Sequence, residues 1–163
     1  MLQRITLLLI LAALPLTAQE KPTPSPTVFR LEYTIVKLEG ARKVQSQNYS
    51  LLANDQKSSR MRMGFKVPIG GPSGIQYLDV GVNIDAQPML VEPNLVRLNT
   101  KMEVSAVGEK EMEGSGPRSP VIQSFNDQTE ATIPLDKPVI LTSQDDPTSK
   151  MTIQVQVVAR VFK

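Results

Sequence analysis

The sequence contains no cysteine, no histidine and no tryptophan among its 163 residues. Without cysteine and histidine, the Ser-His-Asp and Cys-His arrangements of nucleophilic catalysis are excluded. Nearly all zinc and haem sites are excluded too, because their ligands come mostly from these two residue types. We therefore predict no catalytic residue, no cofactor and no metal site, and we expect that the protein is not an enzyme.

Aromatic residues are also scarce, at 4% of the chain, and the charges nearly cancel, with 18 basic against 16 acidic residues. Few aromatic rings mean few stacking surfaces for bases or sugars. A chain so close to neutral creates no field that would attract nucleic acid or an anionic membrane. We expect neither of them as a partner.

The first residues follow the order of a secretory signal peptide. Arg4 supplies a positive charge, residues 5–16 are nearly all apolar, and Ala18 places a small residue before Gln19. The apolar run has about a dozen residues, fewer than the roughly 20 that a membrane-spanning helix needs. We expect cleavage after Ala18, a periplasmic or secreted mature protein, and no membrane span once the signal is removed.

The rest of the chain divides into a linker and one domain. Residues 21–27 alternate proline with threonine and serine, a composition typical of an extended linker. The part that follows is long enough to bury a core without disulfides. The predicted organisation is a signal peptide at residues 1–18, a linker at 19–27 and a single β domain at 28–163.

Apolar and polar residues alternate with a period of two throughout that domain, which predicts strands rather than helices. Val155 and Val157, for example, are expected to face inward. We predict a glycine-rich loop from Gly70 to Gly74 and a mobile loop from Gly108 to Pro120. The fold class is all-β, an antiparallel sandwich or small open barrel of about eight strands. These strands lie near residues 29–35, 44–52, 61–67, 75–86, 96–106, 121–133, 138–143 and 151–161.

Two groups of charged residues are candidates for a binding site. Arg60 and Arg62 lie on one face of a predicted strand, where they would suit an anionic polymer. Asp79, Asn83 and Asp85 share a face of another strand, although calcium loops are curled rather than extended. The solvated face of a half-buried strand explains both groups as simply. A soluble periplasmic module that binds a small ligand or an anionic polymer is therefore our alternative function.

Residues 77–88 resemble a strand of the secretins, the ring-forming outer-membrane channels of bacterial secretion and pilus systems. Their Tyr-Leu-Asp-Val-Gly-Val sequence is similar to the Tyr-x-Asp-Val-Gly-Val strand of the secretin C-terminal domain. Residues 96–107 and 129–141 continue in the manner of that family. Thr142 and Ser143 replace its double glycine, and its ring-building repeats and Val-Pro-x-Leu-Gly-Asp motif are absent. The whole chain also resembles small exported β proteins of Gram-negative bacteria.

This resemblance implies a stand-alone β module of the cell envelope rather than a complete secretion pore. In secretins such strands join a sheet that is shared between subunits. The resemblance therefore implies an interaction with an envelope protein, or self-association, as the function. Tyr77, Asp79 and Gly81 carry the resemblance, and with Arg60 and Arg62 they are our predicted interaction residues.

The signal peptide gives a direct prediction. Protein purified from the cell envelope fraction should begin at Gln19, because Ala18 is the small residue suitably placed after the apolar run. Amino-terminal sequencing measures this. Cytoplasmic protein that retains Met1 would contradict both the cleavage and the export.

Overall fold

The structure is a computed structural model that describes residues 27–71, 74–111, 120–146 and 150–162. Its strands fall at all of the predicted places. They are β1 (Val28–Glu39), β2 (Arg42–Asn54), β3 (Ser59–Gly71), β4 (Gly74–Glu92), β5 (Leu95–Glu111), β6 (Pro120–Pro134), β7 (Val139–Asp145) and β8 (Met151–Phe162). No helix long and apolar enough to cross a membrane occurs in the described part of the chain.

The glycine-rich loop predicted from Gly70 to Gly74 falls between two paired strands, because β3 and β4 remain paired as far as Gly71 and Gly74. Gly74 has φ of +117°, a conformation that favours glycine, and residues 72–73 lie outside the described residues. The predicted signal peptide, most of the linker and residues 112–119 of the predicted mobile loop lie outside the described residues.

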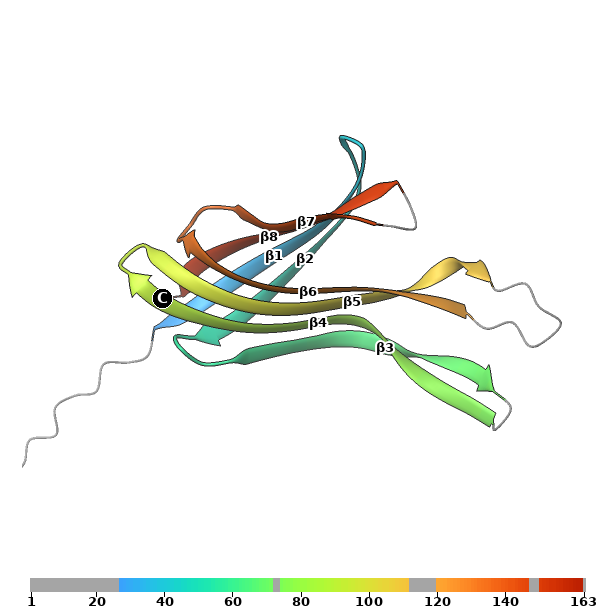
Figure 1. The fold of residues 1–163 in the computed structure, drawn as a ribbon. Helices are drawn as coiled ribbons and strands as arrows, with labels where there is room; N and C mark the ends of the chain where they lie inside the picture. Colours follow the sequence, from blue (N-terminus) through green and yellow to red (C-terminus); the bar gives the residue numbers. More distant parts are fainter. Residues whose placement is uncertain (1–26, 72–73, 112–119, 147–149, 163) are drawn as a thin grey trace, which may run out of the picture.

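The strands form two antiparallel sheets of four strands each, in the orders β2-β1-β8-β7 and β3-β4-β5-β6. Figure 1 shows the two sheets as separate layers that do not close into a barrel, which agrees with the predicted sandwich. Along the chain, β1 and β2 form a hairpin in one sheet, β3 to β6 form the whole of the other sheet, and β7 and β8 complete the first sheet.

The core lies between the inner faces of these sheets, as the period-two pattern predicted. Val155 and Val157 are fully buried, which confirms their predicted inward orientation. The strands contribute unequally to the core, and its buried members come chiefly from the central ones. They are Phe29, Leu31, Tyr33 and Ile35 of β1, Val82, Ile84 and Ala86 of β4, Val96, Leu98 and Met102 of β5, and Val155, Val157 and Ala159 of β8, with Ala53 and Ile133.

The sheets lie together at one end and separate toward the other. In Figure 1 they approach each other near the β4–β5 turn, whereas the β1–β2 tip rises away from the β3–β4 and β5–β6 hairpins. Burial follows the same gradient. Tyr33 is fully buried in β1, but the residues from Ala41 to Asn48 are exposed. The far ends of the hairpins therefore project beyond the core.

One buried hydrogen bond crosses between the sheets. The Tyr33 hydroxyl in β1 lies 2.7 Å from the Thr100 hydroxyl in β5, and each residue is fully buried. A buried hydroxyl without a partner is costly, so the two groups satisfy each other. Burial raises the pKa of Tyr33, and the hydrogen bond with Thr100 opposes that rise only in part.

Tyr33→Phe should lower the free energy of unfolding by about 1–2 kcal/mol at pH 7, because it leaves the Thr100 hydroxyl buried and unpaired. The raised pKa means that the unfolded chain loses this proton first. Its contribution to stability is therefore fully present below about pH 10 and falls as the pH rises above that value. Urea unfolding at pH 7 and pH 11 should show a smaller difference between wild type and Tyr33→Phe at the higher pH. A difference that widens at pH 11 would contradict this assignment.

Candidate functional site

The predicted interaction residues all lie on the β3–β4 hairpin. The register pairs Arg60 with Asp85, Gly64 with Gly81, and Pro68 with Tyr77. Successive side chains of a strand point to opposite faces, so every second residue shares a face. Arg60, Arg62, Asp79, Gly81 and Tyr77 therefore lie on one face of the hairpin, the outer face of the sandwich.

The charges on this face pair with one another across the two strands. A guanidinium nitrogen of Arg62 lies 2.7 Å from an Asp85 carboxylate oxygen, and Nε of Arg60 lies 3.9 Å from the same oxygen. The ammonium group of Lys66 is 3.2 Å from Asp79. The basic residues of β3 and the acidic residues of β4 on this face thus neutralise each other. This arrangement gives no support to an anionic-polymer site built on Arg60 and Arg62.

The hairpin leaves the sheet at a pair of glycines. Along β4, pairing with β5 begins only at Val82, whereas pairing with β3 continues to Gly74. At the point of separation, the backbone N–H of Gly81 donates to the Ser105 hydroxyl at 2.9 Å, in place of a ladder bond. Beyond it, residues 65–71 and 74–80 form what we name the β3–β4 arm. Figure 1 shows the arm diverging from the β5–β6 hairpin.

Glycine is required at this point because the two backbones approach too closely for a side chain. A Cβ on Gly81 would lie 2.1 Å from the Met63 carbonyl oxygen, and one on Gly64 would lie 2.4 Å from the Val80 oxygen. Gly81 also has φ of +154°, which other residues rarely adopt. Gly81 was predicted as an interaction residue, and the structure gives it a backbone role.

The arm carries exposed apolar side chains on both of its faces. Phe65, 61% exposed, lies on the same face as the buried Val80, whereas Tyr77, 65% exposed, lies on the opposite face. Ile75 is 68% exposed on the Tyr77 face. Large apolar side chains exposed on both faces of one hairpin make the arm a candidate interaction site.

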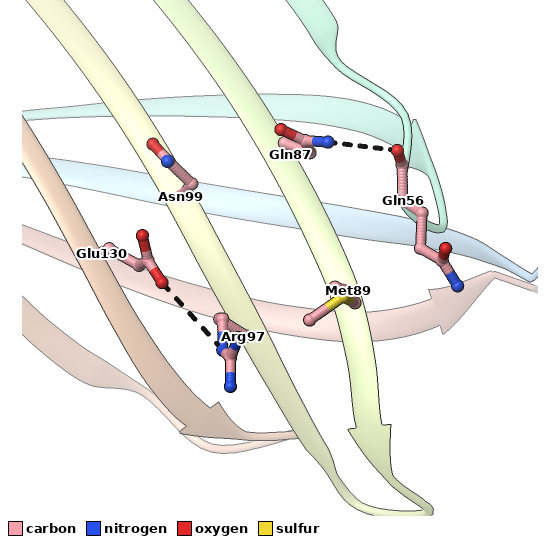
Figure 2. A pocket seen from close by; sticks show the side chains of 6 residues that line it. All are labelled: Gln56, Gln87, Met89, Arg97, Asn99 and Glu130. Carbon is pink, nitrogen blue, oxygen red and sulfur yellow. Dashed lines mark hydrogen bonds and ion pairs between the residues drawn. The ribbon is translucent and has the colours of Figure 1, made fainter.

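A second feature, which the sequence analysis did not identify, lies at the other end of the same outer face. Gln87, Asn99 and Glu130 pair across β4, β5 and β6 and form one row, and Met89 and Arg97 belong to the next. With Gln56 from the β2–β3 turn they line a depression of about 300 Å³ (Figure 2). The row exists only through the register of three strands, so no local pattern in the sequence indicates it.

Comparison with known proteins shows which solved structures have a similar fold. No protein-family model and no curated protein sequence matches the chain. Among solved structures, the chain is similar to Aeromonas hydrophila ExeD, with a TM-score of 0.61 and 11% identity over 84% of this chain and 49% of that one. The type II secretion system secretin GspD of E. coli K12 gives 0.57 and 11%, over 85% and 51%.

A third solved structure agrees with these two. The secretin XcpQ of Pseudomonas aeruginosa gives a TM-score of 0.60 and 12% identity, over 84% of this chain and 59% of that one. These likenesses confirm, for the fold, the resemblance to secretins that residues 77–88 predicted. The chain spans about half the length of the first two structures.

The glycine pair gives a prediction. Gly81→Ala should lower the free energy of unfolding by at least about 2 kcal/mol, because it combines an unfavourable φ with a backbone clash. Gly40→Ala is the matched control. Gly40 also has positive φ, of +59°, but a Cβ there meets nothing within 4 Å, so it should cost about 1 kcal/mol. Urea unfolding measures both, and equal losses would show that the close approach at Gly81 is relieved at no cost.

Proposed function

We propose that the mature chain is a non-enzymatic structural module of the cell envelope, which acts by strand pairing with a second copy of itself or with another envelope protein. The observation that carries this proposal is the pair of unsatisfied edges of the β3-β4-β5-β6 sheet. Among the described strands, β3 and β6 each have a neighbour on one side only. An edge strand presents a row of backbone donors and acceptors that another strand can satisfy.

The two edges of this sheet are complementary in direction, and their strands carry charges of opposite sign, although Arg62 and Lys66 already pair with β4 and Glu130 with Arg97. β3 contains Arg60, Arg62 and Lys66 and no acidic residue, whereas β6 contains Asp127 and Glu130 and no basic residue. Each strand of the sheet runs antiparallel to its neighbour, so β3 and β6 are antiparallel to each other. A β6 edge would therefore meet the β3 edge of a second copy in antiparallel orientation, as in the rest of the sheet.

The edges of the other sheet are less suited to this role. β7 has seven residues, and its register with β8 shifts between Ile140 and Thr142. The β1–β2 register shifts between Lys37 and Leu38. Short strands and bulges discourage edge pairing, so these features favour β3 as the pairing edge. β6 is partly protected as well, because its register with β5 shifts between Val107 and Glu111 and the inward carboxylate of Asp127 accepts a hydrogen bond from Thr129 at 2.9 Å.

The structural neighbours support a role in assembly. They are secretins of secretion systems, and one of them was solved in a pilotin–secretin complex. The predicted signal peptide adds support for a place in the envelope. A sequence without histidine or cysteine suits a module whose work is done by backbone pairing, because strand addition needs no special side chain.

Sedimentation of the purified mature chain, with chemical crosslinking, tests the proposal. We expect concentration-dependent association that weakens as salt rises, because the edge charges are exposed and therefore screened. Reversing two charges of the β3 edge, in Arg60→Glu with Lys66→Glu, should weaken association about tenfold or more through like-charge contact with β6.

The matched control makes the same change in net charge away from that edge. Lys43→Glu with Lys101→Glu alters β2 and the central strand β5, and it should leave association unchanged. Circular dichroism of both variants checks that they remain folded. A chain that stays monomeric, and that binds no protein of an envelope extract through β3 or β6, would refute the proposal.

A further inference from the structure

The β2–β3 turn is fixed against the edge of β4, beyond the point where β4 stops pairing with β3. The backbone N–H of Gln56 donates to the Pro88 carbonyl at 2.7 Å, and the Leu90 N–H donates to a carboxylate oxygen of Asp55 at 2.9 Å. The Gln87 side-chain amide donates to the Gln56 carbonyl at 3.1 Å. Gln56 adopts φ of +60°, a conformation that a glutamine holds only when its surroundings impose it. The turn is thus a rigid wall at one side of the depression.

Planar polar groups line the floor beside this wall. Figure 2 shows the side chains of Gln87, Asn99 and Glu130 on three adjacent strands, with Arg97 beside Glu130. Nε of Arg97 lies 4.0 Å from a Glu130 oxygen, and about half of each side chain is exposed, at 50% and 59%. Within the described part of the chain, the Asn99 side chain has no hydrogen-bond partner. The depression therefore offers amide donors and acceptors that are free to bind a ligand.

The charges of the depression balance, which restricts the ligand to a neutral molecule. An anion near Arg97 would also face Glu130, and a cation near Glu130 would also face Arg97. The apolar contribution is small, because Met89 is the one apolar side chain of the lining. The ligand must then be recognised mainly by hydrogen bonds.

A peptide is disfavoured because β4 has no free edge here. The backbone groups of Pro88 and Leu90 that an added strand would need already bind the β2–β3 turn. Recognition must pass through side chains, and carboxamide, carboxylate and guanidinium groups pair well with adjacent hydroxyls, which both donate and accept. Polyhydroxylated molecules meet this requirement best.

We infer that this depression is a binding site for a neutral saccharide, either a free oligosaccharide or the glycan of an insoluble polymer. Gln56, Gln87, Asn99 and the Arg97–Glu130 pair bind its hydroxyls. The site lacks the aromatic stacking ring that would strengthen saccharide binding, because the lining contains no aromatic residue, so the affinity is expected to be low. A few hydrogen bonds without stacking correspond to a dissociation constant on the order of 1 mM. The inference does not depend on strand pairing at β3 or β6.

Titration of the ¹⁵N-labelled mature chain with maltotriose and with triacetylchitotriose, followed by NMR, tests the site. We expect saturable shifts in the side-chain amide signals of Gln87 and Asn99 and in the Arg97 Nε–H signal. Asn99→Ala should weaken binding about tenfold or more, because it removes the one carboxamide of the lining that has no partner among the described residues. Gln128→Ala, an exposed amide in the next row of the same face, is the control and should bind as wild type.

Cosedimentation with isolated cell-wall sacculi separates the two sources of the ligand. Cosedimentation that Asn99→Ala abolishes, together with weak shifts by the trisaccharides, assigns the site to a polymeric glycan. Saturable shifts without cosedimentation assign it to a free saccharide. The absence of both, or binding that is the same in wild type and Asn99→Ala, would overturn the inference.

Discussion

The structure depends on one constraint, which is that the apolar set of every strand must meet the apolar set of the opposite sheet. A strand turns alternate residues to opposite faces, so its inward set cannot be changed without moving the whole set outward. Residues 29–35 of β1 and 80–86 of β4 obey this most completely, and their inward members are fully or almost fully buried. The Tyr33–Thr100 hydrogen bond lies within this contact and satisfies polar groups there that water cannot reach.

The same constraint explains why the sandwich has an open end. Apolar residues continue along the inner face of β3 through Phe65, but the facing part of β2 is polar and exposed around Gln45 and Gln47. With no apolar partner opposite, the hairpin ends have no reason to stay together, and they separate (Figure 1). The Gly64–Gly81 pair marks the start of the arm. Phe65, Ile75, Tyr77 and Leu78 are thereby left exposed on that arm, away from the outer-face depression.

The groups that remain available for binding are not the charged residues that the sequence predicted. The charges predicted as a ligand site, on Arg60, Arg62, Asp79 and Asp85, are consumed in cross-strand pairs. What stays available is backbone at the edges of β3 and β6, apolar surface on the arm, and amide groups around Asn99. Strand pairing would use the backbone edges of β3 and β6, and saccharide binding would use side chains of the outer face; the two proposals share Glu130, which lies on the edge strand β6 and also lines the depression.

The sequence by itself determined the strands, their inward faces and the likeness to secretins, because period-two alternation and turn residues are local properties. Thus Val155 and Val157 were assigned correctly. The glycine-rich loop expected at Gly70–Gly74 falls where β3 ends at Gly71 and β4 begins at Gly74, with residues 72–73 outside the described part of the chain. Only the tertiary structure decided which strands are edges, that Asp85 neutralises Arg62, and that Gln87, Asn99 and Glu130 form one row. Each of these is a matter of which residues lie opposite one another across strands, and that register is set by packing of the whole sandwich rather than by any segment of the chain.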